Sequence, residues 1–172
     1  MLTEISRLYK EDPEKAAKYS DMVAEGIQEV NLIAPSDDFT LLNKEAIFKG
    51  IENWKPTWDS IWGGDIRSEK FMLPSNLDFL MDYALLTKDK VALQHVELTL
   101  DKMALGGIYD HIGGGFFRYS TDSRWKVPHF EKMLYDNAQA LNLYSKAYKV
   151  FNKPLHKNIV LGTIDFLERE MK

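Results

Sequence analysis

The sequence predicts an all-α protein built from helical hairpins. Apolar residues recur at helical spacing over most of the chain, and Gly, Pro and Asp mark where these segments begin and end. Two glycine clusters, Gly63-Gly64-Asp65 and Gly113-Gly114-Gly115, lie about fifty residues apart in two long connections. Such a period indicates stacked hairpins joined alternately by short and long loops, and an α/α toroid with its long loops at one rim fits it.

Each element follows from a local signal. Asp12 followed by Pro13 is typical of a helix start, and Gly106 is typical of a helix end. Residues 55–74 read as an irregular connection, and 116–127 could form a small β-hairpin on the second long loop. The pattern predicts helices over 13–30, 40–54, from 74 onward, 88–105, 131–151 and 154–171.

Composition excludes several classes of protein. The net charge of -4 over 172 residues gives no electrostatic footprint for nucleic acid. No apolar run approaches the roughly 20 residues needed to cross a bilayer, so we expect no membrane partner and a cytoplasmic location. The absence of cysteine excludes disulfides and thiolate chemistry. We expect no cofactor and no metal site, because no two histidines have the helical spacing of a zinc site.

One connection is rich in chemically active residues. The stretch from 106 to 137 holds five of the ten glycines, two of the four histidines and a mixture of Arg, Asp, Glu, Tyr and Trp. A loop of this length usually binds or catalyses something. We therefore expect the functional surface at the rim where this loop lies.

The same stretch resembles a known family. It reads GGIYDHIGGGF from Gly106, RYS from Arg118 and WKVPHFEKMLYDN from Trp125. This motif is similar to the signature of thioredoxin-domain-containing proteins of the YyaL and spermatogenesis-associated type, over roughly 40–172. The resemblance implies an N-terminal thioredoxin-like domain joined to an (α/α)6 barrel similar to N-acylglucosamine 2-epimerases and six-hairpin glycosidases.

The resemblance also implies a domain organisation. Residues 1–38 would be a helical linker resembling the end of the thioredoxin-like domain, and 39–172 would be an incomplete barrel domain. The earlier loop departs from the family pattern, with Gly63-Gly64-Asp65 where Gly-Gly-Phe is usual. We expect the chain to be inactive alone, to act beside a thioredoxin-like domain, and to self-associate through helix faces that later hairpins would cover.

A barrel of this kind implies a sugar or sugar-acid ligand, and the loop holds groups for two chemistries. An epimerase or isomerase needs an acid and a base, for which His111 and His129 are suited. A glycosidase needs two carboxylates flanking the scissile bond, which Asp110, Glu131 or Asp136 could supply. The predicted catalytic residues are therefore His129, His111, Glu131 and Asp110. Ligand contacts are expected from Arg118, Tyr119, Trp125, Tyr109, Tyr135 and Asp136.

Structural roles compete with these assignments. The glycines can simply permit a tight turn, and His129 can fix the entry of a helix. Glu131 and Asp136 would lie in the first turns of a helix over 131–151, with Asp136 four residues after Lys132. Tyr144, Tyr148 and Phe151 form a core stripe; His95 reads as a helix residue with a satisfied partner, and His156 as a surface residue.

Two functions from different classes remain open. The first is a fragment of a carbohydrate-active barrel, an epimerase, isomerase or glycosidase-like enzyme that has no turnover as an isolated piece. The second is a non-catalytic binding or interaction module that partners a thioredoxin-like domain.

Overall fold

The computed structural model describes residues 2–31 and 43–172, which form two compact units divided between Asn43 and Lys44. The first unit contains α1 (Leu2–Glu11) and α2 (Pro13–Asn31). The Asp12 carboxylate accepts the Lys15 N–H at 3.0 Å and caps α2, which confirms the predicted start of this helix. The helix α1 was not predicted, and the predicted domain boundary at 38/39 lies outside the described residues.

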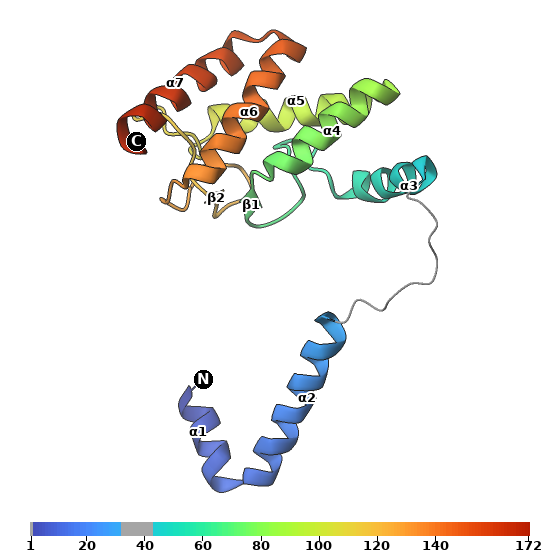
Figure 1. Cartoon of the computed structure of the whole chain (residues 1–172), viewed down its shortest axis with the longest axis vertical. Helices are drawn as coiled ribbons and strands as arrows, with labels where there is room; N and C mark the ends of the chain where they lie inside the picture. Colours follow the sequence, from blue (N-terminus) through green and yellow to red (C-terminus); the bar gives the residue numbers. More distant parts are fainter. Residues whose placement is uncertain (1, 32–42) are drawn as a thin grey trace. The chain divides into compact units, whose positions relative to one another are not determined.

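The second unit is made of helical hairpins with a small sheet, which confirms the all-α hairpin prediction (Figure 1). Closure of these hairpins into a toroid stays a prediction. None of the described helices is both long and apolar enough to cross a membrane. The elements of the second unit are, in order, α3 (Lys44–Trp54), the 3-10 helix η1 (Lys55–Thr57), β1 (Lys70–Phe71), α4 (Pro74–Thr87), α5 (Lys90–Leu105), β2 (Tyr119–Ser120), α6 (Leu134–Phe151) and α7 (Pro154–Glu170).

Two hairpins with short turns lie side by side. In the first, Lys88 adopts a left-handed conformation after α4, and the Asp89 carboxylate caps α5 through the N–H groups of Val91 and Ala92. In the second, Asn152 adopts the same left-handed conformation after α6. The helix α4 packs against α6, and α5 packs against α7. The two long connections, 58–73 and 106–133, therefore meet at one end of the helices, as the loop periodicity predicts.

The core lies between the two hairpins. Leu80 and Met81 of α4, Leu100 and Met103 of α5, and Tyr144 of α6 are fully buried. The Tyr144 hydroxyl donates a hydrogen bond to the Leu100 carbonyl at 2.8 Å, so its polar end is satisfied inside the core. The predicted core role of Tyr144 is confirmed, whereas Tyr148 and Phe151 are only half-buried.

The small sheet joins the two long loops rather than forming within one of them. Lys70 of β1 pairs with Ser120 of β2, and Phe71 pairs with Tyr119, in antiparallel register. The second loop does turn back on itself, but later than predicted, since Ser120 forms a bridge with Pro128. A partner strand fifty residues earlier was not predicted, and it places the first loop against the second.

The helix predicted over 131–151 begins instead at Leu134. Glu131 and Lys132 therefore precede the helix, and the proposed Lys132–Asp136 pairing across one helical turn is wrong. The reason is a distant contact: the Lys132 ammonium lies 2.6 Å from an Asp110 carboxylate oxygen in the earlier part of the loop. This ion pair holds the segment before α6 against the glycine turn.

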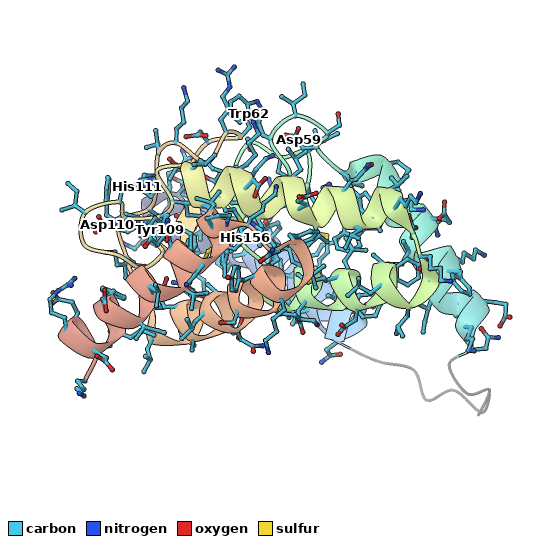
Figure 2. All side chains as sticks on the ribbon, turned by 90° about the horizontal axis from the view of Figure 1, so that it is seen from above. Asp59, Trp62, Tyr109, Asp110, His111 and His156 are labelled. Carbon is cyan, nitrogen blue, oxygen red and sulfur yellow. The ribbon has the colours of Figure 1, made fainter. Side chains whose placement is uncertain are left out.

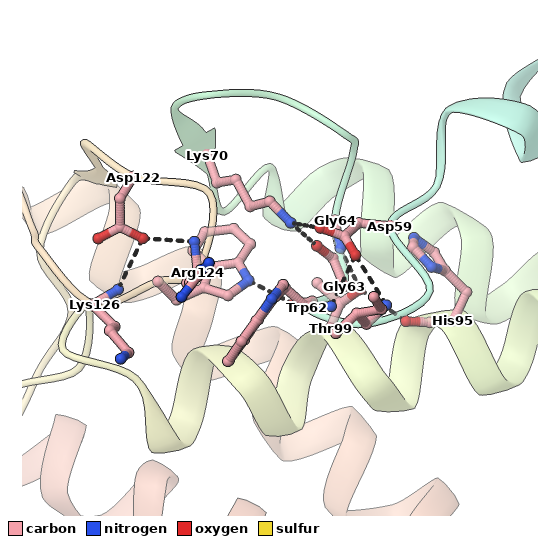
Figure 3. Close-up of polar contacts among 12 residues, drawn as sticks. Asp59, Trp62, Gly63, Gly64, Lys70, His95, Thr99, Asp122, Arg124 and Lys126 are labelled. Atoms are coloured by element: carbon pink, nitrogen blue, oxygen red, sulfur yellow. Dashed lines mark hydrogen bonds and ion pairs between the residues drawn. The ribbon is translucent and has the colours of Figure 1, made fainter.

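Each long loop is closed by an ion pair between an aspartate and a lysine. We call this arrangement, in which the aspartate also accepts two backbone N–H groups and the lysine also binds a glycine carbonyl, the aspartate–lysine lock. In the first, one Asp59 oxygen accepts the N–H groups of Ile61 and Trp62, both at 2.9 Å. The Lys70 ammonium binds the other Asp59 oxygen at 2.6 Å and also the Gly63 carbonyl (Figure 3). The Lys70 side chain is 2% exposed, so this pair is screened little by solvent.

The second lock repeats the aspartate and the glycine of the first at an interval of 51 residues, whereas its lysine stands 62 residues later. Asp110 stands 51 positions after Asp59 and, in the same way, accepts the N–H groups of the residues two and three positions later, at 2.9 and 2.8 Å. Its lysine is Lys132, which binds Asp110 at 2.6 Å and the Gly114 carbonyl at 2.8 Å. The repeat predicted from the glycine clusters is thus confirmed, with Gly63 equivalent to Gly114.

Glycine is required where each lock approaches a helix. Gly63 has a φ of 70°, and a Cβ atom there would lie 2.5 Å from the Thr99 Cα of α5. Gly114 has a φ of 74°, and its Cβ would lie 2.2 Å from the Gly162 carbonyl oxygen of α7. Both the left-handed conformation and the close backbone contact exclude a side chain. The first loop therefore packs directly against α5, and the second loop packs directly against α7.

Gly63→Ala should lower the free energy of unfolding by roughly 2–4 kcal/mol, because it combines left-handed strain with overpacking against α5. Chemical denaturation of the two proteins measures the difference. Gly50→Ala is the matched control: Gly50 lies in α3 with nothing within 4 Å of its Cβ position, so alanine should stabilise by about 0.5–1 kcal/mol. Equal stability of Gly63→Ala and wild type would contradict the close contact.

Candidate functional site

The backbone of the second loop brings five predicted site residues into one group, the rim cluster of Arg118, Tyr119, His129, Glu131 and Asp136. The Arg118 N–H donates to the Glu131 carbonyl at 2.8 Å, and the His129 N–H donates to the Tyr119 carbonyl at 2.9 Å. Asp136 enters from the first turn of α6. The chain before and after the turn at 122–126 is thereby held in register.

The side chains of the rim cluster are linked by charge and by ring contacts. A single Glu131 carboxylate oxygen lies 3.7 Å from the Arg118 guanidinium and 3.5 Å from His129 Nδ1. The Tyr119 ring stacks on His129 and also on Phe71 of β1, each with centroids 4.8 Å apart. The charged side chains are about half exposed, and such pairs contribute little to stability. Their arrangement is available for contact with a ligand.

Two polar atoms of the cluster are buried and have no hydrogen-bond partner among the described residues. They are Asp136 Oδ2 and His129 Nδ1. Burial raises the pKa of Asp136 above its ordinary value of 3.8, and the Arg118 charge opposes part of that rise. A carboxyl with a raised pKa is typical of proton-transfer sites.

The predicted catalytic residues Asp110 and His111 contact other groups than this cluster, and Figure 2 shows both beside Tyr109 on the second loop. Hydrogen bonding from Lys132, and then from the Gly113 N–H, lowers the pKa of Asp110 to about 2. Its carboxylate is fully engaged in the lock and is a poor acid or base near neutral pH. His111 is exposed, and its Nε2 lies 2.9 Å from the Gly106 carbonyl oxygen. Both residues therefore have local structural partners.

Trp125 and Tyr109 do not present ring faces to a ligand. Trp125 is fully buried, and its indole N–H donates to the Trp62 carbonyl at 2.8 Å, joining the two loops. Tyr109 is 8% exposed, and its hydroxyl lies against Gly162, where a Cβ atom would come within 2.2 Å of the oxygen. Burial raises the pKa of this hydroxyl. The expected stacking of a sugar on these rings is inconsistent with their burial, whereas Tyr135 is about half exposed.

A turn held by one carboxylate sets the position of Trp125. The Asp122 oxygens accept the N–H groups of Arg124, Lys126 and Val127, at 2.5, 3.3 and 2.6 Å (Figure 3). These bonds lower the pKa of Asp122, although burial opposes them. They also hold Trp125 at a φ of 63°, which a residue with a side chain rarely adopts. The turn was predicted, but its role in burying Trp125 was not.

His156 is a correction to the sequence prediction, because it is fully buried rather than on the surface. Its Nε2 lies 2.9 Å from an Asp101 oxygen, and Lys153 binds the same carboxylate group. His156, Ile159 and Thr163 recur at helical spacing on the buried face of α7. That periodicity was the signal that could have shown its burial.

The described residues offer no ready-made metal site. Within 2–31 and 43–172, no group of three or more His, Asp or Glu side chains is placed to hold an ion. The chemistry that the rim cluster can supply is proton transfer and anion binding by its own side chains.

The chain is similar in sequence to known proteins of the type that the loop motif indicates. Spermatogenesis-associated protein 20 of Homo sapiens is 43% identical over 118 residues, which are 66% of this chain and 15% of that protein. The Mus musculus protein of that name is 42% identical over the same number of residues and the same shares. The chain is similar to spermatogenesis-associated protein 20. This similarity supports the family resemblance that the loop motif predicts.

A third relative extends the match. An uncharacterized protein of Caenorhabditis elegans is 41% identical over 140 residues, which are 78% of this chain and 19% of that protein. No family model matches the chain. The chain thus spans less than a fifth of the length of these relatives.

Asp136→Asn should stabilise the protein at pH 7 by less than about 1 kcal/mol, because it removes a poorly solvated charge that solvent partly screens. Because the pKa of Asp136 is raised in the folded protein, its protonated form stabilises the fold. This stabilisation is present below pH 3.8 and is lost as pH rises through the folded pKa. The advantage of the variant should therefore vanish below pH 3.8. Urea denaturation across pH 3–7 measures it, and a variant less stable at pH 7 than at pH 3.5, relative to wild type, would contradict the assignment.

Asp110→Asn should have the opposite pH profile. The lowered pKa means that the Asp110 contribution is present above pH 3.8 and is lost as pH falls toward about 2. The variant should be destabilised by roughly 1–3 kcal/mol at pH 5, with a difference that shrinks toward pH 2. Acid titration followed by circular dichroism measures this. Asp21→Asn, on the exposed surface of α2, is the control and should follow wild type.

Proposed function

We propose that the chain is part of a carbohydrate-active α/α barrel protein whose rim cluster transfers protons on a sugar or sugar acid. The observation that carries this proposal is two buried atoms that make no hydrogen bond among the described residues. They are Asp136 Oδ2, whose carboxyl feels the Arg118 charge, and His129 Nδ1, which lies 3.5 Å from the Glu131 carboxylate. A buried polar atom without a partner costs free energy, and such a cost is common where a ligand completes the hydrogen bonds.

The roles follow from the chemistry of each group. His129 would remove the proton from the carbon beside a carbonyl, and Asp136, with its raised pKa, would return a proton. Arg118 would bind a carboxylate or the oxygen on which negative charge develops. Tyr119 and Phe71 would lie along the apolar face of the sugar ring. A glycosidase would instead use Glu131 and Asp136 as its two carboxylates.

One observation favours the second candidate, an interaction module that partners a thioredoxin-like domain. Ile112 is fully exposed at the tip of the second loop, and Phe130, next to the rim cluster, is 77% exposed. Large apolar side chains at exposed positions are typical of protein contacts. This candidate needs no proton transfer and predicts that Phe130 matters more than His129.

A thermal-shift screen of neutral sugars, sugar phosphates and uronic acids tests the proposal. One class should raise the melting temperature of the chain, and the effect should be lost in Asp136→Asn and His129→Ala, because both remove groups that the ligand completes. His111→Ala is the matched control, since its side chain lies outside the cluster, and it should keep the response. The chain alone should convert no sugar, because it spans less than a fifth of its relatives.

Two outcomes would redirect the assignment. A flat response from a folded protein to all three sugar classes would favour the interaction module, as would loss of partner binding in Phe130→Ala. Conversion of a sugar by the chain alone would show that the site is complete without further residues.

A further inference from the structure

A cavity of about 160 Å³ lies in the first loop, next to the rim cluster. It is bounded by the end of α3, the loop at 64–73, the start of α4 and one face of α5. One water molecule needs only roughly 10–15 Å³, so the cavity has room for a ligand of many atoms. No residue of the proposed catalytic group lines it.

His95 of α5 is the informative residue in this cavity. It is 7% exposed, and its ring stacks on Trp58 with centroids 4.3 Å apart and planes 6° apart. The stack fixes the orientation of the ring, and neither ring nitrogen has a hydrogen-bond partner among the described residues. The ring nitrogens are not among the buried polar atoms that lack a partner, so they are open to the cavity, where a ligand can hydrogen-bond to them. The sequence predicted a helix residue with a satisfied partner; His95 does lie in α5, and its partner is the Trp58 ring.

Near His95, the Asp65 carboxylate uses only one of its two oxygens in hydrogen bonds. One Asp65 oxygen accepts the Trp54 indole N–H at 2.9 Å and the Thr57 hydroxyl at 3.1 Å. The other oxygen has no partner among the described residues, and Asp65 lines the same cavity. Thr99, by contrast, is satisfied, since it donates to the His95 carbonyl and accepts the Gly64 N–H, each at 2.8 Å. The free capacity for hydrogen bonding therefore lies with His95 and Asp65.

The charged side chains that line the cavity indicate which class of ligand it can bind. The cavity is lined by two acidic side chains, Asp65 and Glu69, and two basic ones, Arg67 and Lys70, so it has no excess of positive charge for an anion. The Lys70 ammonium is already bound by Asp59 and Gly63. Burial lowers the pKa of His95 to about 4, so its ring is neutral at pH 7, with one nitrogen that donates and one that accepts. A neutral molecule with hydroxyl groups matches these requirements.

Phe71 connects this cavity to the rim cluster. It lines the cavity and also stacks on Tyr119 in the neighbouring loop. We propose that the cavity is a second subsite for a neutral, hydroxyl-bearing ring, such as one sugar unit, with His95 and Asp65 hydrogen-bonded to its hydroxyls. The inference rests on the proposed function for the ligand class and on the cavity for its location.

Nuclear magnetic resonance of the 172-residue chain tests the subsite directly. Glucose should shift the assigned His95 imidazole and Trp54 indole signals in a saturable manner. Tetrahydropyran, which has the same ring without hydroxyls, and inorganic phosphate should not. His95→Phe keeps a ring on Trp58 but cannot hydrogen-bond, and it should weaken glucose binding by at least about tenfold. His111→Phe is the matched control and should bind as wild type does.

The outcomes separate this subsite from the rim cluster. Shifts at His95 that persist in Asp136→Asn support the subsite independently of the proton-transfer site. Glucose shifts confined to His129 and lost in Asp136→Asn would overturn the subsite while leaving the proposed function standing. Shifts at His95 with phosphate but not with glucose, or no shift at His95 with any of the three probes, would also overturn it. The wild-type titration decides the question even where His95→Phe does not fold.

Discussion

Two lysine ammonium groups organise the end of the second unit at which the two long loops meet. Lys70 and Lys132 each bind an aspartate and a glycine carbonyl in their own loop, and each thereby closes a turn that lies directly on a helix. Long irregular loops leave many backbone groups to be satisfied. The locks satisfy these groups from within the loop and leave the strand pairing and the buried Trp125 to join one loop to the other.

Asp110 in the second loop and Asp136 in the first turn of α6 have opposite electrostatic environments. Asp110 accepts hydrogen bonds from backbone and lysine, which lowers its pKa, whereas Asp136 is partly desolvated beside Arg118, which leaves its pKa raised. The first contributes to the fold, and the second costs stability near neutral pH. A protein retains such a cost where a ligand or a reaction gains from it. This contrast distinguishes the two carboxylates, which residue type alone does not.

Local signals predicted the helices well, and distant contacts account for the errors. Asp12 and Gly106 act on their own neighbours, so the sequence is sufficient to locate the helix ends they mark. The start of α6 depends on Lys132 meeting a residue 22 positions earlier, and no local pattern contains that information. The motif included all five rim-cluster residues among ten predicted site residues, but it could not separate them from Trp125, whose burial depends on the first loop. Aligning the two loops on Asp59 and Asp110 matches Gly63 with Gly114, but the lysines stand 11 and 22 residues after their aspartates, so the alignment does not contain the whole lock.

The pairing of β1 with β2 has a kinetic consequence. It joins Lys70 to Ser120, so it can form only after the intervening hairpin has closed a segment of about fifty residues. The helical hairpins are local and can fold first, whereas the contacts between loops must follow. The surface that holds the rim cluster is therefore expected to order last, and amide hydrogen exchange should find it opening before the helices do. An ordered rim cluster would therefore indicate that the two successive hairpins have assembled in the correct register.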